Sequence, residues 1–125
     1  MDKLIFLVDD TNSVLALGAS VLEAEFLVLT MSSAAKMFSI LEKKQPDMII
    51  LDVEMPDMNG FEACAKLRDN LAWKNIPVLF LTGYIDEEIQ SRAAELDALD
   101  VICKSEIGSG LLERVRGSFD AIATQ

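Results

Sequence analysis

Five polar side chains share one feature of position, because each stands where a short apolar run ends. These residues are Asp9, Asp10, Asp52, Thr82 and Lys104. Short apolar runs without alternation are typical of strands that are buried on both faces of a parallel sheet. Parallel strands point the same way, so we expect the five side chains to gather at one edge, where open α/β sheets bind their ligands.

Three of these side chains are carboxylates, and bringing them together has an electrostatic cost. Two carboxylates about 4 Å apart repel each other by roughly 4 kcal/mol at an effective dielectric constant near 20. Asp9, Asp10 and Asp52 therefore require a cation, a raised pKa or both. A hard divalent ion with oxygen ligands fits this set, which predicts a Mg²⁺ site that Mn²⁺ would also fill.

A lysine and a hydroxyl beside such a cluster suit phosphoryl transfer. Asp52 would attack the phosphorus atom in line, while the ion and Lys104 neutralise charge on the phosphoryl oxygens. Each residue also has a plainer interpretation: Asp10 as a helix cap, Asp52 as a turn residue, Thr82 as an ordinary hydroxyl and Lys104 as a solvated lysine. Their coincidence at the ends of four strands favours one common site.

Composition excludes several other functions. The chain contains no histidine, which excludes Ser-His-Asp, Cys-His and histidine-ligated metal sites. Its formal charge of −10 argues against a nucleic-acid or anionic membrane surface. The chain has neither an apolar run long enough to cross a bilayer nor a signal peptide. Cys64 and Cys103 form no CxxC motif, and we interpret them as buried free thiols in a cytoplasmic protein.

The elements that must position these residues alternate along the chain. Strands are expected over residues 4–8, 26–31, 48–52, 77–82 and 101–103. Helices are expected over about 12–25, 33–45, 60–70 and 86–96, and from residue 109 or 110 onward. Helical spacing places Ala35 and Leu71 among the inward-facing residues. This alternation predicts a single α/β domain over residues 1–125, with a doubly wound five-stranded parallel sheet and helices on both faces.

The motifs resemble those of the receiver domains of bacterial two-component response regulators, over essentially the whole chain. They are Val8-Asp9-Asp10, Leu51-Asp52 followed by Met55-Pro56 and Gly60, Leu81-Thr82-Gly83, and Lys104. The resemblance, which is to single-domain chemotaxis regulators in particular, implies a flavodoxin-like fold with strand order 2-1-3-4-5.

The resemblance also implies a role for each matched residue. Asp52 would accept a phosphoryl group from a phosphohistidine on a partner histidine kinase or histidine phosphotransfer protein. Asp10, Asp52 and the backbone carbonyl of Glu54 would bind Mg²⁺ directly, with Asp9 acting mainly through a bound water.

The phosphoryl group itself would be held by residues of the neighbouring strand ends. Thr82 would hydrogen-bond one phosphoryl oxygen and shift on phosphorylation, and Lys104 would pair with another. The backbone N–H groups near Glu54 and Gly83 would bind the same group.

Three positions depart from the family pattern. Val101 stands where an aromatic residue is usual, so the usual coupling between that ring and the threonine is in question. Ser105 stands where a cis-proline is usual, and because a cis bond before serine costs about 2.5–4 kcal/mol we expect a trans peptide. Asp97 stands at a helix end where glycine is common, and aspartate tolerates left-handed backbone geometry.

Further positions are expected to tune the phosphorylated state and to transmit it. Glu54 and Tyr84 flank the path of an attacking water, and we hypothesise that Tyr84 shields the aspartyl phosphate; the alternative is an ordinary half-exposed aromatic. Residues Asp86 to Gln125 form the family's usual output face, where we expect a downstream protein to bind. We expect no output module within the chain. It would then either signal by binding a partner or form the N-terminal part of a longer regulator.

The leading hypothesis is a phosphoacceptor signalling domain rather than an enzyme with an external substrate. A second hypothesis is an interaction module that does not depend on phosphorylation, to which Val101 and Ser105 give weight. A third is a small phosphohydrolase with Asp52 as its nucleophile, prompted by the spacing of Asp52 and Glu54. The third lacks an additional general acid or base and a cap domain.

Overall fold

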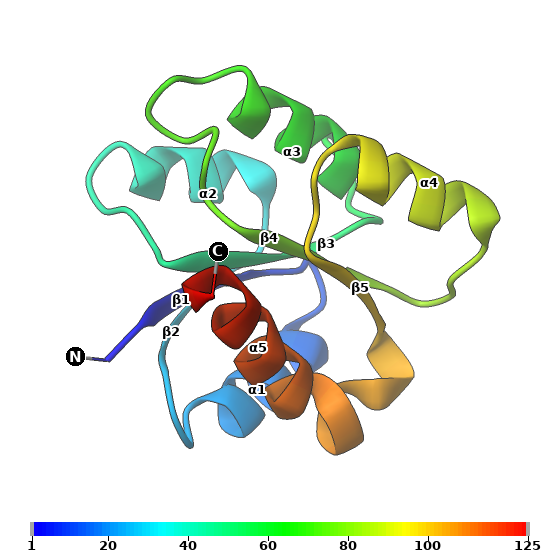
Figure 1. Cartoon of the computed structure of the whole chain (residues 1–125). Coiled ribbons are helices and arrows are strands. Elements are labelled where there is room, and N and C mark those ends of the chain that lie inside the picture. Colours follow the sequence, from blue (N-terminus) through cyan, green and yellow to red (C-terminus); the bar gives the residue numbers. More distant parts are fainter. Residues whose placement is uncertain (1, 125) are drawn as a thin grey trace.

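Each expected apolar run forms a strand, and each strand is followed by a helix, in the computed structural model, which describes residues 2–124 (Figure 1). In chain order the elements are β1 (Leu4–Val8), α1 (Asn12–Leu22), β2 (Leu27–Met31), α2 (Ala34–Leu41), β3 (Met48–Asp52), α3 (Gly60–Arg68), β4 (Val78–Thr82), α4 (Glu87–Glu95), β5 (Asp100–Cys103), a 3₁₀ turn (Lys104–Glu106) and α5 (Ile107–Ala123).

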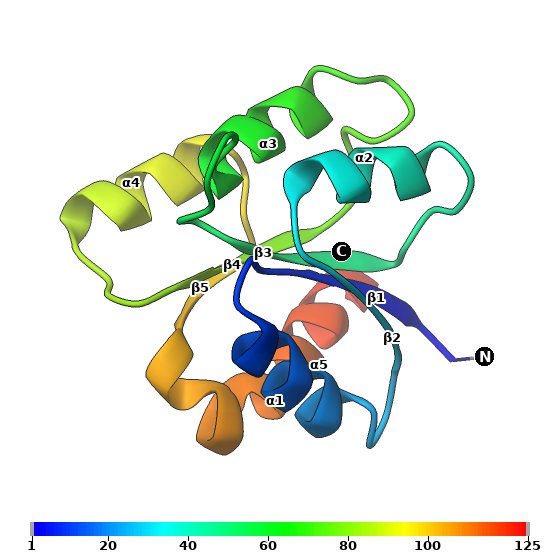
Figure 2. The same cartoon turned by 180° about the vertical axis from the view of Figure 1, so that it is seen from behind.

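The five strands are parallel and lie in the order β2-β1-β3-β4-β5, which confirms the predicted fold and strand order. Helices α1 and α5 cover one face of the sheet, and α2, α3 and α4 cover the other (Figures 1 and 2). The winding direction reverses between β1 and β3, which are adjacent in the sheet. The carboxyl ends of these two strands therefore border the crevice where folds of this kind bind ligands.

The central strands are buried on both faces, as their unbroken apolar sequences predict. Every residue of β3 and β4 is buried. Toward α2, α3 and α4 the three central strands present Phe6, Val8, Ile49, Leu51 and Phe80. Toward α1 and α5 they present Ile5, Leu7, Ile50, Leu79 and Leu81. The sheet is thereby fixed between two apolar layers, and its strand ends form a firm platform.

Polar side chains cap α2, α3 and α4, the three helices that begin next to this platform on one face of the sheet. The Ser33 side chain accepts a hydrogen bond from the Lys36 backbone N–H, and Asp86 caps α4 in the same way. At the start of α3, Asn59 and Glu62 form a reciprocal capping box. Such caps satisfy N–H groups that have no partner within the helix.

Several boundaries and orientations differ from expectation. Helix α1 ends at Leu22, three residues early. Helix α5 begins at Ile107 rather than at residue 109 or 110, because the 3₁₀ turn leads directly into it. Ala35 and Leu71 are exposed, so their predicted inward orientation was wrong. No helix within residues 2–124 is long and apolar enough to span a membrane.

Two backbone expectations at the departures from the family pattern are confirmed. No cis peptide bond occurs within the described residues, so the bond before Ser105 is trans. Asp97 has a φ of 57°, in the left-handed region. Asp57 shares this geometry, with a φ of 68°, which the sequence analysis did not predict.

The left-handed backbone at Asp97 leads to a prediction about stability. We expect Asp97→Gly to raise the free energy of unfolding by about 0.5–1 kcal/mol, because glycine adopts this conformation without steric cost. Asp97→Ala should lower it by about 1 kcal/mol, because alanine gains no local hydrogen bonding in return for the strain. Urea unfolding of the two variants measures both changes, and equal stabilities would contradict this explanation.

Candidate functional site

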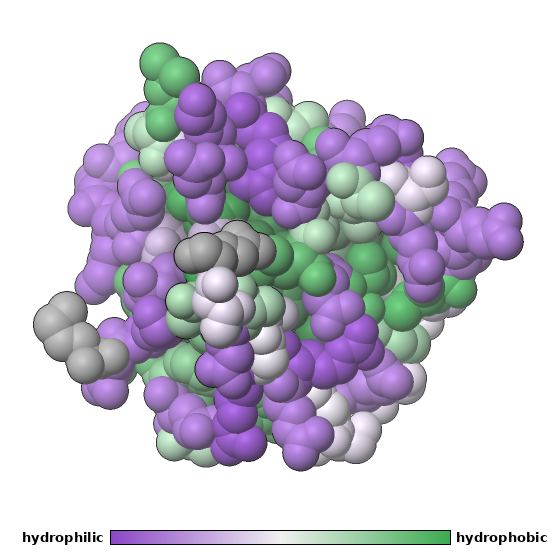
Figure 3. All heavy atoms as spheres, in the orientation of Figure 1, coloured by the Kyte–Doolittle hydropathy of each residue, from purple (hydrophilic) through white to green (hydrophobic). Residues whose placement is uncertain are grey.

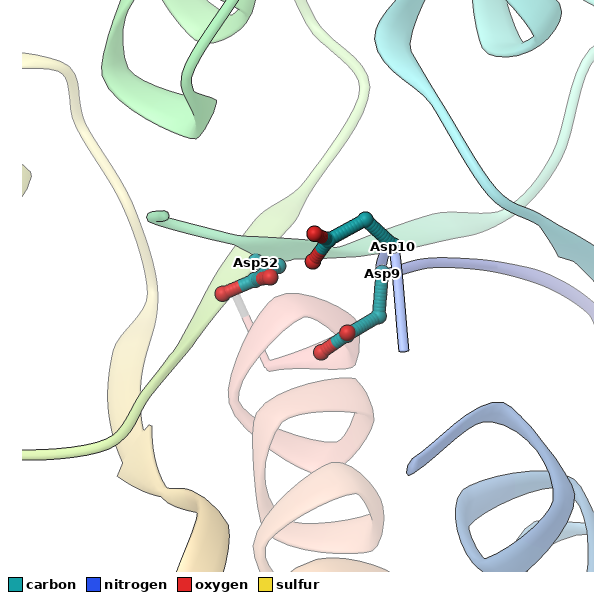
Figure 4. A group of neighbouring side chains, drawn as sticks. All are labelled: Asp9, Asp10 and Asp52. Carbon is teal, nitrogen blue, oxygen red and sulfur yellow. The ribbon is translucent and has the colours of Figure 1, made fainter. Parts of the chain in front are cut away.

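Three carboxylates converge at the adjoining ends of β1 and β3. Val8 lies opposite Leu51 in the sheet, so Asp9 and Asp10 follow one strand directly beside Asp52, which ends the other. One carboxylate oxygen of each aspartate lies within 4.8 Å of those of the other two. Figure 4 shows the three side chains grouped around a common space. Asp9 and Asp52 are fully buried, whereas Asp10 is exposed.

Lys104 supplies the positive charge that faces this cluster. Its ammonium Nζ lies 2.9 Å from Oδ2 of Asp9 and 3.2 Å from Oδ1 of Asp52. Burial by itself lowers the pKa of Lys104, but the contacts with the two carboxylates outweigh it and raise the pKa. Lys104 is therefore a cation at neutral pH.

One lysine does not compensate two buried carboxylates. Burial, followed by the charge of Asp9, raises the pKa of Asp52 to about 7, although the Glu54 backbone N–H and Lys104 act in the opposite direction. Asp52 is thus poised between its neutral and charged forms near neutral pH. A bound cation would shift this balance toward the carboxylate.

Backbone hydrogen bonds hold the inner oxygen of each buried carboxylate. Oδ1 of Asp9 accepts from the Thr11 backbone N–H at 2.9 Å, and Oδ1 of Asp52 accepts from the Glu54 N–H at 3.1 Å. By contrast, Oδ2 of Asp52 is buried and accepts no hydrogen bond from any residue among 2–124. A buried acceptor without a partner is costly, so this oxygen is suited to contact an ion or an incoming group.

The cluster fits a hard divalent cation. Carboxylate oxygens are the ligands that Mg²⁺ and Mn²⁺ accept, and the exposed position of Asp10 leaves room for the waters that Mg²⁺ retains. The alternative interpretation of Asp10 as the cap of α1 was wrong, because Thr11 occupies the cap position and no side chain caps this helix.

Gly60 brings α3 against the end of β3. Its N–H donates to the Val53 carbonyl at 2.9 Å, and a Cβ atom at this position would lie 2.2 Å from the carbonyl oxygen of Asp52. No side chain fits there, since real Cβ atoms do not approach backbone oxygen that closely. Gly60 therefore fixes the backbone that carries Asp52, which is a physical reason for its place in the motif.

Thr82 lies at the end of β4, fully buried, with its hydroxyl turned toward its own loop. Thr82 Oγ1 donates to the Tyr84 carbonyl at 2.8 Å and accepts from the Tyr84 N–H at 3.4 Å. Gly83 is exposed, and Oε1 of Glu54 lies 4.0 Å from the position of its missing Cβ. The side chain of Tyr84 is 56% exposed. Thr82, Gly83 and Tyr84 thus lie at the carboxyl end of β4, the strand next to β3, and Gly83 faces the Glu54 side chain.

Val101 lies in a recess under α4. A cavity of about 470 Å³ lies between α4 and β5, lined in part by Ile85, Ala93, Ala98 and Val101. Figure 3 shows apolar surface in this region, bordered by hydrophilic side chains of α4. The recess lies within the expected output face, residues 86–125, together with its preceding loop.

Sequence reasoning missed the role of Cys103 in this neighbourhood. Cys103 is a free thiol, as expected, but it is partly exposed rather than buried. Its Sγ accepts a hydrogen bond from Ser105 Oγ at 3.2 Å and donates to the Gly83 carbonyl at 3.6 Å. Hydrogen bonds from the Ser105 side chain and backbone lower the pKa of the thiol. The contact with Ser105 is local, but the pairing of β4 with β5 is what brings Cys103 beside Gly83, and no local motif predicts that contact.

A doubly wound parallel sheet with acidic residues and a lysine at its switch point defines a class of α/β domains that bind ligands at that edge. Within this class, the model of the response regulator receiver domain family matches residues 5–116, and the chain belongs to that family. Receiver domains interact with histidine kinases and downstream effectors and generally bind Mg²⁺ at an acidic pocket.

Two relatives illustrate how widely the domain is shared. The chain is 33% identical to protein RcaC of Microchaete diplosiphon over 91% of its own length and 18% of that protein. It is 32% identical to response regulator PleD of Caulobacter vibrioides over 93% of its length and 26% of that protein. The chain therefore spans about a fifth to a quarter of the length of these relatives.

Solved receiver structures superpose closely on the chain. The BeF₃-activated receiver domain of DrrB matches with a TM-score of 0.84 and 25% identity, over 96% of this chain and 99% of that one. The phosphorylated cyanobacterial phytochrome response regulator RcpA matches with a TM-score of 0.81 and 28% identity, over 94% of this chain and 91% of that one.

The raised pKa of Asp52 predicts how the metal-free protein responds to pH. The pKa of this carboxyl is near its ordinary value of 3.8 in the unfolded chain and about 7 in the folded chain. Its ionisation therefore destabilises the fold increasingly as the pH rises through this window. We expect Asp52→Asn to raise the free energy of unfolding by about 1–3 kcal/mol at pH 8, and by less at pH 5.

Urea unfolding at several pH values without divalent ions measures this effect. Asp57→Asn provides a matched control, since it removes an exposed carboxylate nearby. A gain for Asp52→Asn that does not grow with pH would contradict the assigned cause.

Proposed function

We propose that this domain is a phosphoacceptor that takes a phosphoryl group onto Asp52 from a phosphohistidine on a histidine kinase or histidine phosphotransfer protein. The observation that carries the proposal is Asp52 Oδ2, a buried oxygen with no hydrogen-bond partner among residues 2–124, beside Lys104 and two further carboxylates. Because the 125 residues contain no histidine, the donor histidine lies outside this domain.

In the proposed reaction a carboxylate oxygen of Asp52 attacks phosphorus in line with the bond to the leaving imidazole. The new P–O bond forms as the P–N bond breaks, and the bonding electrons leave with the imidazole nitrogen. Lys104 neutralises negative charge on the phosphoryl oxygens, which it reaches from its position beside Asp52. The backbone N–H groups of Glu54 and Gly83 provide further donors.

A divalent ion completes the charge balance. Mg²⁺, when bound, supplies charge neutralisation for the phosphoryl oxygens, and Asp10, Asp52 and the Glu54 carbonyl would hold it, with Asp9 acting through a water. Asp9 already contacts Lys104 and so keeps the ammonium beside Asp52.

Phosphorylation then has to change the surface that a partner reads. The Thr82 hydroxyl leaves the Tyr84 carbonyl and contacts a phosphoryl oxygen, which releases the loop between β4 and α4. A β-branched valine at position 101 makes no large ring rotation, so the loop and α4 carry the response to a downstream protein at the Asp86–Gln125 face. The proposal includes no contact with nucleic acid or membrane and places the domain in the cytoplasm.

Two related structures support the phosphoacceptor proposal by what their descriptions state. The DrrB receiver domain is described as BeF₃-activated, and RcpA is described as phosphorylated. Both proteins share the present fold at 25% and 28% identity.

An interaction module that acts without phosphorylation is the second candidate, and Val101 with the open recess beneath α4 favours it. Continuous hydrolysis of an external phosphate ester is less well supported, because the two buried carboxylates, Asp9 and Asp52, are both paired with Lys104.

Phosphorylation by a small acyl phosphate tests the proposal directly. We expect acetyl phosphate with Mg²⁺ to add one phosphoryl group to the wild-type chain, and none when the metal is chelated. Asp52→Asn should abolish the adduct, whereas Asp57→Asn should retain it. Intact-mass spectrometry measures these outcomes, and a wild-type chain that gains no adduct while still binding its partner would favour the phosphorylation-independent module.

The exposed ring of Tyr84 leads to a prediction about the lifetime of the aspartyl phosphate. We expect Tyr84→Ala to speed dephosphorylation several-fold, because water then reaches the phosphoryl group more freely. Tyr84→Phe keeps the ring and should retain the wild-type rate. The decay of the phosphorylated mass after removal of acetyl phosphate gives the rate constants, and equal rates for all three proteins would leave Tyr84 as an ordinary surface aromatic.

A further inference from the structure

A short chain of hydrogen bonds links the two loops on either side of the candidate site. Ser105 Oγ donates to Cys103 Sγ at 3.2 Å, and Cys103 Sγ donates to the Gly83 carbonyl at 3.6 Å. The thiol is thus both acceptor and donor, and the direction of donation runs from Ser105 to Gly83. Lys104 stands between Cys103 and Ser105 in the sequence, so these hydrogen bonds flank the backbone of the residue that carries the ammonium.

The same hydrogen bonds hold one particular peptide unit of the β4–α4 loop. The peptide between Gly83 and Tyr84 has its carbonyl bound by Cys103 and its N–H bound by Thr82 Oγ1 at 3.4 Å. Cys103 lies directly opposite Thr82 in the pairing of β4 with β5. When the Thr82 hydroxyl turns away from this loop, the peptide loses one of its two partners and keeps the thiol.

Lys104 needs such support because its side chain is long and the residue that follows it is not a proline. The Lys104 carbonyl accepts from the Ile107 N–H, and Ile107 is buried, which fixes the far side of the 3₁₀ turn. The near side is tied by Ser105 to Cys103 and through it to Gly83. A backbone held from both sides limits where the ammonium can lie and so favours its short contacts with Asp9 and Asp52.

We propose that Ser105 and Cys103 are positioning residues for phosphoryl transfer, which hold Lys104 and the Gly83 peptide in register with Asp52. This inference rests on the proposed phosphoacceptor function and goes beyond it by assigning a role to two residues that touch neither the metal nor the phosphoryl group. Ser105 thereby supplies through a side chain the rigidity that the turn lacks without a proline.

Four variants separate this role from a general effect on folding. Ser105→Ala removes the first donor, and Cys103→Val removes the thiol at nearly constant volume. Ser105→Thr keeps the hydroxyl and serves as the rescue variant. Ser109→Ala is the matched control, because it makes the same change at an exposed position of α5 with no side-chain hydrogen bond within the described chain.

Two measurements are needed, one of chemistry and one of geometry. The rate constant for phosphorylation by acetyl phosphate at saturating Mg²⁺ should fall about three- to tenfold in Ser105→Ala and Cys103→Val, the effect of losing one hydrogen bond. Mg²⁺ affinity should stay close to the wild-type value, because neither residue supplies one of the proposed carbonyl or carboxylate ligands. In the metal-free protein, the ¹⁵N–¹H signals of Gly83 and Tyr84 should shift in both variants. Ser105→Thr and Ser109→Ala should resemble the wild type in every measurement.

The outcomes distinguish failure of this inference from failure of the proposed function. Equal rate constants and unshifted Gly83 and Tyr84 signals in Ser105→Ala and Cys103→Val would overturn the positioning role while leaving Asp52 as the phosphoacceptor. A parallel loss of rate, Mg²⁺ affinity and stability would also overturn it, since that pattern marks a general distortion. Absence of any adduct on the wild-type chain would instead overturn the proposed function, and with it the positioning role.

Discussion

Two buried carboxylates that share one ammonium are the interaction on which the rest of the structure depends. Asp9 and Asp52 lie at adjoining strand ends, fully buried, and Lys104 contacts both of them. Their repulsion amounts to several kcal/mol in this environment, and one lysine offsets only part of it. The site is therefore incomplete in charge without a cation. This lack of positive charge is the common physical cause of the raised pKa of Asp52, of the site's suitability for a metal ion and of the readiness of Asp52 to attack an electrophile.

The fold tolerates this cost because the apolar layers beneath the site are large and well packed. Each fully buried leucine, isoleucine or phenylalanine of the central strands contributes about 1.5–3 kcal/mol, so a few of them offset the uncompensated charge. The same packing makes the site rigid. Gly60 allows α3 to approach the Asp52 carbonyl closely, and backbone N–H groups of Thr11 and Glu54 fix the carboxylates. Core stability thus sustains a locally unfavourable arrangement, as is common at functional sites.

The fold and the carboxylate cluster were predictable from sequence, because both depend on local patterns repeated along the chain. Unbroken apolar runs mark buried strands, and a polar residue at the end of each run places it at the sheet edge. The strand order came from the family resemblance instead, since periodicity carries no information about neighbours. What the sequence concealed depends on contacts between distant segments. The early start of α5 follows from the 3₁₀ turn after Lys104, and the bonding of Cys103 to Gly83 follows from the pairing of β4 with β5.

In the proposed function, chemistry and response are separable because different residues would determine them. The groups proposed to receive the phosphoryl group lie on strand ends that the core holds fixed, so their geometry is insensitive to the surface. In the proposed function the response would depend on the loop after β4, where Thr82 is bonded to Tyr84, and on the recess beside Val101 beneath α4. That region has few buried side chains, since Ala93 is the one residue of α4 that is buried. A weakly packed helix over an open recess needs little free energy to move. Releasing a single hydrogen bond at Thr82 is therefore sufficient in magnitude to bias the position of α4, even without an aromatic side chain to relay the change.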